Sequence, residues 1–232
     1  MGVSSWDGTL SSRDFHIFAS AFAEKWQRMN PTLPSWAWVT LPKLPWTAKY
    51  EVEGYLSLEK LCFLRYSEDN HNEVSHKENE GPLCSNEEPL DNAVLVCIYW
   101  QVQSYHHEVH YCDLHIVYSV SYKVPVLYFR AYSSDGQYLV LDDIEKHLPA
   151  SSEKVVKESK WTFITQEEHP YLKRPWYTLH PCGTSEWMKL LFLGDAAAHA
   201  AIDELYLVSW LSVVGQVVGL KIPFEMLKLN SS

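Results

Sequence analysis

One short stretch of the chain combines residue types that could perform nucleophilic chemistry. Cys182 follows His180 and Pro181 and precedes Gly183, and a second His-Pro pair begins upstream at His169. The reactive form of cysteine is the thiolate, and its reactivity depends on where the fold places it. Pro181 fixes its own φ and Gly183 permits an unusual turn, so these two residues would present the thiol rigidly on a loop. The stretch therefore predicts a nucleophilic cysteine.

A helix is expected directly after this loop, over Glu186–Leu193. Thr184 or Ser185 can cap that helix, and Glu186 would lie in its first turn. The positive end of the helix dipole would then point back toward the sulfur of Cys182 and favour a negative charge there. The nearby histidines could either brace the loop or move a proton.

Three other interpretations of the same residues stay open. A lone cysteine in an intracellular protein is often a small buried side chain without chemistry. A zinc site built from His169, His180 and Cys182 would lack a fourth ligand at the usual structural spacing. A cysteine hydrolase would need a base, and the local signatures of cysteine proteases are absent from the sequence.

The residues around Cys182 resemble the active-site segment of a known family. Residues 163–170 read F-I-T-Q-E-E-H-P, and the motif H-P-C follows at residues 180–182. This combination resembles the autophagic E2-like conjugating enzymes, of which one branch, autophagy-related protein 3, modifies a phospholipid. The stretches Tyr118–Arg130 and Ser209–Pro223 favour the other branch, the autophagy-related protein 10 family, in a plant-like form. The resemblance covers roughly residues 93–223.

The resemblance implies an E2-like fold and a conjugation reaction in autophagosome formation. An E1-like enzyme, autophagy-related protein 7, would pass the ubiquitin-like autophagy-related protein 12 to Cys182 as a thioester. A lysine of autophagy-related protein 5 would then attack the carbonyl and form an isopeptide bond, without a cofactor or a metal. The alternatives are a lipid-conjugating enzyme of the autophagy-related protein 3 type and a modifier-binding scaffold that has lost catalysis.

Both steps of such a reaction pass through a tetrahedral oxyanion, which needs a hydrogen-bond donor aimed at it. Ubiquitin E2 enzymes place an asparagine after His-Pro, whereas here the residue after His180-Pro181 is Cys182 itself. Thr165 and Gln166 are candidate donors, and backbone N–H groups near Gly183 are the alternative. The side chains expected to support the site are those of His180, Pro181 and His169.

Acceptor recognition is expected by strand addition at an exposed edge of a sheet, because such an edge offers free backbone donors and acceptors. The place expected for that edge is Tyr118–Tyr128. The side chains expected to contact the partner there are Tyr118, Tyr122, Val126 and Tyr128.

Composition places the chain among ordinary globular proteins. The 232 residues, 47% of them hydrophobic, are enough for a single domain, which we expect to span residues 1–232. The net charge is −10, and no basic patch of the kind that binds nucleic acid is visible. Residues 67–92 hold eight acids and one lysine, so −7 of that charge belongs to a segment that we expect to be a disordered insertion.

The cysteines and the hydropathy pattern indicate the cellular compartment of the protein. Five cysteines without a CxxC pair, together with the absence of a signal peptide, favour a reducing cytoplasm. The most apolar window, Leu205–Leu220, is shorter than the ~20 residues that span a bilayer, so we expect it in the core and expect no transmembrane segment. A histidine-rich run divides between the two faces of a strand, which disfavours a metal site: His106, His110 and Cys112 share one face, and His107 and His115 the other.

The remaining pattern predicts an α+β fold, with an antiparallel β-meander and helices packed on one face. A first helix, capped by Ser12 and ending near Asn30, carries an aromatic stripe at Phe15, Phe18, Phe22 and Trp26. Strands are expected over Trp36–Thr40, within Lys49–Arg65, and over Ala93–Trp100, Glu108–Lys123 and Val124–Tyr132, with a bend, bulge or edge at Pro125. The expected hairpin turn is Ser133–Gly136, followed by the returning run Tyr138–Leu141. A short helix capped by Asp142 is expected over Asp142–His147. The last helix is expected over Ala196–Val214, ended by Gly215 and Gly219.

Overall fold

The structure, a computed structural model, describes residues 6–40, 54–64, 109–147, 164–193 and 201–228. Its helices are α1 (Ser12–Met29), α2 (Leu141–His147), α4 (Thr184–Leu193) and α6 (Ile202–Val214), with the 3₁₀ helices η2 (Gly215–Val218) and η3 (Phe224–Leu227). Its strands are β1 (Ala37–Thr40), β2 (Gly54–Leu64), β3 (Val109–Ser119), β4 (Val124–Ser133), β5 (Ile164–Glu168) and β6 (Pro175–Leu179).

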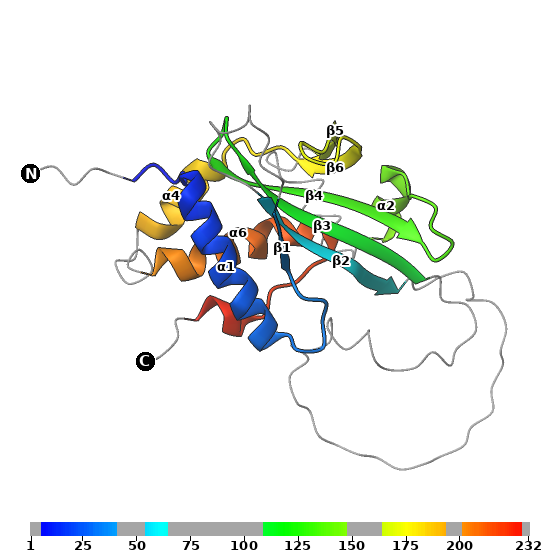
Figure 1. Cartoon of the computed structure of the whole chain (residues 1–232), viewed down its shortest axis with the longest axis horizontal. Coiled ribbons are helices and arrows are strands. Elements are labelled where there is room, and N and C mark those ends of the chain that lie inside the picture. The colour runs from blue at the N-terminus through cyan, green and yellow to red at the C-terminus, as the bar shows by residue number, and fades with distance from the viewer. Residues whose placement is uncertain (1–5, 41–53, 65–108, 148–163, 194–200, 229–232) are drawn as a thin grey trace, which may run out of the picture.

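These strands form one six-stranded sheet in the order β1-β2-β3-β4-β6-β5, and every neighbouring pair is antiparallel. The helices α1, α4 and α6 gather on one side of it (Figure 1). The predicted α+β class, with an antiparallel sheet and helices packed on one face, is therefore confirmed.

The cap of α1 is Ser11, so the prediction of Ser12 was wrong by one residue. The Ser11 hydroxyl accepts the Asp14 N–H at 3.1 Å, and the Asp14 carboxylate accepts the Ser11 N–H at 3.3 Å. Asp14 can close this reciprocal pair only from the third helical position, which makes Ser11 the cap. The predicted aromatic stripe of α1 is buried in the main core.

The β3–β4 ladder has no register shift, and Pro125 pairs with Tyr118 inside it. The predicted bend or bulge at Pro125 was therefore wrong. The edge alternative stays a prediction, because β4 pairs with β6 at Tyr128 and Phe129. The expected strand over Glu108–Lys123 was too long at its end, because residues 120–123 form the turn and Lys123 has φ +55°. The register shift lies instead in the β2–β3 ladder, next to Lys60 with φ +59°.

The hairpin of β5 and β6 was not predicted from the sequence. The two strands pair from Ile164 opposite Leu179 to Glu168 opposite Pro175. Strand β6 then adds to β4, at Tyr128 and Phe129. Four of the five β5 side chains are exposed, so the strand lacks the apolar alternation that reveals strands in a sequence. This hairpin helps to place the site, because β6 leads into the segment that carries Cys182.

Alternate side chains of the central strands belong to two separate apolar clusters. Leu114 and Ile116 of β3 join α1 and α6 in the main core, which also contains Leu127 and Phe129 of β4. The second cluster lies on the other face and is smaller. It consists of Tyr55, Val117, Val126, Tyr128 and Trp176.

The apolar window near the C-terminus is core, as predicted. Residues Leu205–Leu211 of α6 are buried, and α6 ends where Gly215 begins η2. Gly219 ends η2 in the left-handed conformation, with φ +73°. No helix in the described ranges is both long and apolar enough to cross a bilayer. The first residues of the predicted last helix, before residue 201, lie outside the described residues.

The turn after β4 is confirmed, with Gly136 at φ +86°. The predicted return over Tyr138–Leu141 is only a single bridge between Tyr138 and Tyr132. Helix α2 begins at Leu141, so Asp142 lies in its first turn and is not its cap. The predicted strand Ala93–Trp100 and the acidic insertion 67–92 fall outside the described residues.

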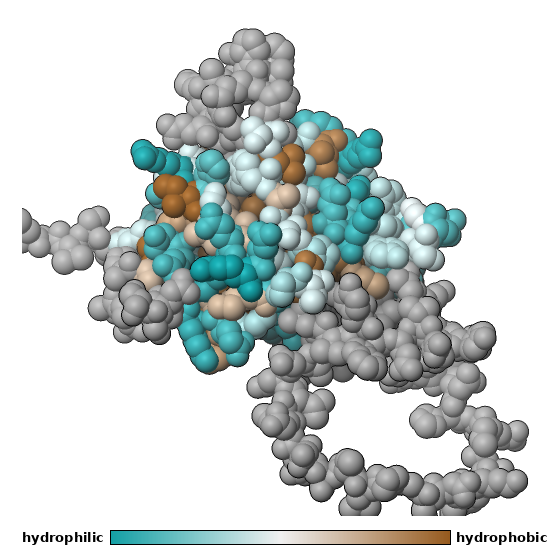
Figure 2. Space-filling view, turned by 60° about the horizontal axis from the view of Figure 1, so that its bottom comes forward, coloured by the Kyte–Doolittle hydropathy of each residue, from teal (hydrophilic) through white to brown (hydrophobic). Residues whose placement is uncertain are grey.

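The surface in Figure 2 is mainly hydrophilic, with apolar side chains in separate small patches. Among the described residues, the most exposed large apolar side chains are Leu190 of α4 and Phe224 of η3, at 74% and 67%. Exposed apolar residues that are scattered singly are normal on a globular protein.

Candidate active site

Cys182 lies in the segment His180–Gly183, between the end of β6 and the start of α4. Its thiol is free and partly buried. Its N–H donates to His180 Nδ1 at 3.2 Å, and the Thr184 N–H donates to the Pro181 carbonyl at 3.2 Å. Gly183 has φ +78°, which favours glycine, and its carbonyl accepts the Trp187 N–H at 3.1 Å. Hydrogen bonds thus hold the loop on both sides of the cysteine.

The ring of His180 joins this loop to the β3–β4 turn. Its Nδ1 accepts the Cys182 N–H, so the proton of the neutral ring is on Nε2. Nε2 lies 3.4 Å from the hydroxyl of Tyr122, and the two rings meet edge to face with centroids 5.5 Å apart. His180 therefore donates to Tyr122, a half-exposed residue of the turn.

Helix α4 begins two residues earlier than predicted, at Thr184. Thr184 and Ser185 are therefore its first residues, and the prediction that one of them caps it was wrong. The chain enters the helix directly from Gly183, because the left-handed glycine turns the backbone sharply enough to start it there. Thr184 is buried, and Glu186 lies in the first turn as expected.

Thr165 and Gln166 lie on β5, opposite Thr178 and Tyr177 of β6. Both side chains are exposed. The Thr165 hydroxyl donates to Glu167 at 3.1 Å. Strand β5 thus presents these two candidates beside the strand that leads to Cys182, and the Thr165 hydroxyl bonds within β5 itself.

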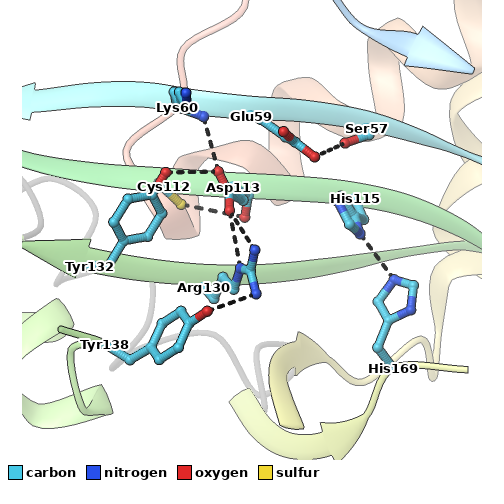
Figure 3. Close-up of polar contacts among 10 residues, drawn as sticks. All are labelled: Ser57, Glu59, Lys60, Cys112, Asp113, His115, Arg130, Tyr132, Tyr138 and His169. Atoms are coloured by element: carbon cyan, nitrogen blue, oxygen red, sulfur yellow. Dashed lines mark hydrogen bonds and ion pairs between the residues drawn. The ribbon is translucent and has the colours of Figure 1, made fainter. Parts of the chain in front are cut away.

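His169 follows β5 and is fully buried, on the sheet face away from the helices. Its Nε2 lies 3.0 Å from Nδ1 of His115 on β3 (Figure 3). Its Nδ1 accepts the N–H groups of Tyr171 and Leu172 at 3.3 and 3.2 Å. An Nδ1 that accepts leaves the proton on Nε2, so His169 donates to His115 and both rings are neutral.

Burial is the main reason why this histidine pair stays neutral. The pKa of His115 falls to about 3, first through burial and then through the positive charges of His169 and Arg130. The pKa of His169 falls to about 4, first through burial and then through the positive charge of Arg130. His169 therefore fastens the β5–β6 turn to the sheet, while His180 contacts Cys182. The structure does not bring the three residues of the zinc interpretation together around the cysteine.

A buried ion pair neighbours the two histidines. Asp113 of β3 accepts from Arg130 Nε and Nη2, both at 3.0 Å, from the Lys60 N–H at 2.9 Å and from the Tyr132 hydroxyl at 3.3 Å (Figure 3). The guanidinium of Arg130 lies over the ring of Trp176, 4.5 Å from its centroid. The same ring stacks on His115, with centroids 4.2 Å apart. This network links β6 to the central strands.

The residues expected to contact a partner lie in the hairpin of β3 and β4. Strands β3 and β4 are interior to the sheet, but the β2–β3 ladder reaches only to Ile116 and β4 pairs with β6 at Tyr128 and Phe129. Strand addition along Tyr118–Tyr128 therefore stays a prediction. Tyr118 is buried toward the helices, while Val126 and Tyr128 are buried on the other face. Only Tyr122 is exposed, because it lies in the turn. The sheet edges in the described part of the chain are β1 and β5.

The described residues contain no group of three or more histidine, cysteine, aspartate or glutamate side chains that could hold a metal ion. Of the histidine-rich run, His106 and His107 lie outside the described ranges. Cys112 packs in the main core and His115 lies on the other face, as the strand alternation predicted. Burial raises the pKa of the Cys112 thiol far above its usual range, so this cysteine is inert.

Sequence reasoning missed two groups that shape this region, His115 and Asp113. Both are polar residues on a strand whose other side chains are mainly apolar. Their partners His169 and Arg130 are 54 and 17 residues away, so no local motif links them. A buried polar residue inside an apolar strand is the only signal that could have pointed to them.

Comparison with known proteins gives consistent results over nearly the whole chain. The family described as "Autophagocytosis associated protein, active-site domain" matches residues 15–225. A protein of Arabidopsis thaliana named ubiquitin-like-conjugating enzyme ATG10 is 49% identical over 222 residues, which cover 95% of this chain and 96% of that protein. The human protein of the same name is 30% identical over 232 residues, covering 97% and 96%. A crystal structure titled as the autophagic E2, Atg10, overlaps with a TM-score of 0.47 at 17% identity, covering 91% of this chain and 98% of that one.

Proposed function

We propose, from the premise that this chain belongs to the ATG10 family of ubiquitin-like-conjugating enzymes, that Cys182 carries the modifier as a thioester. Family membership makes the chain an autophagic E2-like enzyme, which receives a ubiquitin-like modifier from an E1-like enzyme. The observation that supports the role of Cys182 is its placement. It is a free, partly buried thiol in a short hydrogen-bonded loop between β6 and α4.

The specific partners are autophagy-related protein 7 as the E1-like enzyme, autophagy-related protein 12 as the modifier and autophagy-related protein 5 as the acceptor. These partners follow from the resemblance of the active-site segment and from the family to which the relatives belong. The working unit is a single domain over residues 1–232, acting in the cytoplasm.

The reaction proceeds in two acyl transfers. The Cys182 sulfur attacks the thioester carbonyl of the charged E1-like enzyme. A new C–S bond forms, the old C–S bond breaks, and the E1 thiol leaves with a proton. The neutral amine of an acceptor lysine then attacks the carbonyl on Cys182. A C–N bond forms, the C–S bond breaks, the amine loses its proton and the Cys182 thiol is restored.

The loop residues serve as positioning groups. His180 fixes the backbone of Cys182 through Nδ1 and the β3–β4 turn through Nε2. Pro181 supplies the carbonyl that holds Thr184. His169 acts farther away, since it anchors the turn between β5 and β6. Precise placement of the reacting sulfur matters because small displacements cost large factors in rate.

The oxyanion donor that we propose is the backbone of the turn into α4. The first N–H groups of a helix have no partner within the helix and point out of its N-terminus. The Thr184 N–H already donates to the Pro181 carbonyl, so the proposed donors are the other N–H groups near Gly183. That turn follows Cys182 directly, whereas the exposed Thr165 and Gln166 lie on β5 and Thr165 already donates to Glu167. The side chains of Thr165 and Gln166 remain the second choice for the oxyanion donor.

Reconstitution tests this proposal. The chain is incubated with autophagy-related proteins 7, 12 and 5 and ATP, in parallel with phosphatidylethanolamine vesicles in place of the acceptor protein. The expected product is a thiol-resistant conjugate of proteins 12 and 5, formed only when the chain is present. Modified phospholipid would instead support the lipid-conjugating alternative. Binding of the modifier without any transfer would support the non-catalytic scaffold.

A further inference from the structure

Residues Trp6–Leu10 run ahead of α1 as a short segment that we call the N-terminal strap. The strap is closed on itself by local hydrogen bonds. The Asp7 carboxylate accepts from the N–H and the hydroxyl of Thr9 at 3.0 and 2.6 Å, and the Trp6 indole donates to the Thr9 carbonyl at 2.8 Å. Gly8 and Leu10 are buried. A segment held this way has one defined conformation to present to its neighbours.

One side of the strap contacts the β3–β4 turn. The Leu10 N–H donates to the Lys123 carbonyl at 2.8 Å, and the Tyr118 hydroxyl donates to the Leu10 carbonyl at 2.8 Å. Tyr122, next to Lys123, is the residue that accepts a hydrogen bond from His180. The strap thus supports the turn that braces the Cys182 loop from the sheet side.

The other side of the strap contacts the first turn of α4. Gly8 approaches this turn so closely that a β carbon on residue 8 would lie 1.8 Å from the Ser185 carbonyl oxygen and 3.0 Å from the Lys189 nitrogen. In an α-helix these two atoms belong to one hydrogen bond. The Tyr206 hydroxyl of α6 donates to the Gly8 carbonyl at 2.9 Å, and Trp6 packs edge to face on Phe192 and Tyr206. Glycine is therefore required at position 8.

We propose that the N-terminal strap is a positioning element for Cys182. It touches both supports of the cysteine loop, the β3–β4 turn before it in the chain and the start of α4 after it. It fixes the distance between them through a contact that only glycine allows. The role concerns the transfer step and so rests on the proposed function of Cys182, but the positioning itself can be measured without any partner protein.

The test compares two glycine substitutions with equal backbone strain. Gly8 and Gly136 both have φ +86°, but a β carbon at Gly136 would meet nothing within 4 Å. Gly8→Ala therefore adds only the clash with α4, relative to Gly136→Ala. The probe is iodoacetamide, and peptide mass spectrometry follows the alkylation of Cys182 relative to Cys62 in the same molecules. Neither thiol forms a disulfide and both are partly buried, so Cys62 reports any general loosening of the fold.

In Gly8→Ala we expect the rate ratio of Cys182 to Cys62 to rise by about threefold, because the loop loses its outer restraint. Gly136→Ala should leave that ratio at the wild-type value. Tyr206→Phe, which removes only the hydroxyl bonded to Gly8, should change the ratio in the same direction with less perturbation of the fold. Equal ratios in Gly8→Ala, Tyr206→Phe and Gly136→Ala would overturn the proposal.

Charging kinetics provide the second readout. With E1-like enzyme loaded with modifier, Gly8→Ala should lower kcat by about tenfold and leave KM unchanged, because the sulfur is misplaced while the docking surface is intact. A rise in KM at constant kcat would instead make the strap part of the docking surface and would contradict the proposal. If wild-type protein accepts no modifier, the proposed function fails, and the alkylation ratio still decides the role of the strap.

Discussion

At the scale of single residues, hydrogen bonds fix how two histidines serve the site in different ways. The side chain of His180 bonds the backbone of Cys182 and the hydroxyl of Tyr122. His169 bonds His115 and two backbone N–H groups of its own turn. His180 therefore holds the Cys182 loop in place, and His169 holds the β5–β6 hairpin that leads into this loop.

The contact between His180 and Tyr122 makes a prediction. Tyr122→Phe removes the acceptor of the His180 Nε2 proton, so the loop loses one restraint and transfer of the modifier should slow by about two- to fivefold. Stability should change little, because Tyr122 is half exposed. Tyr138→Phe is the matched control, since Tyr138 is also exposed and its hydroxyl accepts a hydrogen bond from Arg130 away from Cys182. Single-turnover assays that give equal rates for both variants would contradict this role of Tyr122.

The buried histidine pair predicts how stability depends on pH. Both pKa values are lowered, to about 3 and about 4, so the unfolded chain binds more protons than the folded one below the usual histidine pKa near 6.5. The stabilisation is complete above that pH and is lost as the pH falls toward 4. Between pH 7 and pH 5, we expect the unfolding free energy to drop by about 2 kcal/mol more in wild type than in His115→Gln, which keeps an acceptor for His169. Urea denaturation at several pH values measures this, and parallel curves would refute it.

The sequence identified His169 and His180 because both belong to short local motifs. It could not identify His115 or Asp113, because the partners that make them necessary come from distant parts of the chain. Cys182 was found through its neighbours Pro181 and Gly183, whose backbone restrictions are local. Chemistry that depends on adjacent residues was therefore visible from the sequence, and chemistry that depends on the sheet pairing was not.

At the scale of elements, the sequence predicted the strongly periodic helices and strands reliably. It did not predict reliably the residues at which they begin and end. The aromatic stripe of α1 and the apolar runs of β3 and β4 were found, while the start of α4 was displaced by two residues. The exposed strand β5 left no hydrophobic alternation to detect, and so the hairpin with β6 was missed. The predicted edge at Tyr118–Tyr128 stays a prediction, because β6 pairs with β4 at Tyr128 and Phe129.

The capping box of α1 gives a prediction for one element. Ser11→Ala should reduce the free energy of unfolding by about 1 kcal/mol, because the Asp14 N–H loses its acceptor. Ser20→Ala, in the exposed middle of the same helix, should be neutral or slightly stabilising, because its hydroxyl only bonds back to the His16 carbonyl. Thermal denaturation of the two variants checks the difference. If Ser20→Ala proved the more damaging change, the assignment of the cap would be wrong.

At the scale of the whole molecule, most of the acidic charge belongs to one segment of the sequence. Residues 67–92 hold eight acids and one lysine, −7 of the net −10. The described β2–β3 ladder ends with Leu64 opposite Val109. The chain between them therefore starts and ends at neighbouring positions of the sheet, whatever its length.

This geometry predicts that deletion of residues 67–92 is tolerated. The remaining 18 residues between Leu64 and Val109 still close the loop, and a shorter loop costs less entropy, so stability should rise by a few tenths of a kcal/mol up to about 1. Charging of Cys182 should be unchanged at physiological salt. Circular dichroism and the charging assay check both statements. A loss of charging with an intact fold would assign the insertion a docking role instead.

The central claim is that Cys182 carries the modifier, and a non-reducing gel tests it most directly. Wild type, Cys182→Ser and Cys62→Ser are each mixed with autophagy-related proteins 7 and 12 and ATP. We predict a thiol-sensitive adduct in wild type and in Cys62→Ser, and a thiol-resistant ester in Cys182→Ser. No adduct in any of the three, with the E1-like enzyme shown to be charged, or a thiol-sensitive adduct that persists in Cys182→Ser, would contradict the account.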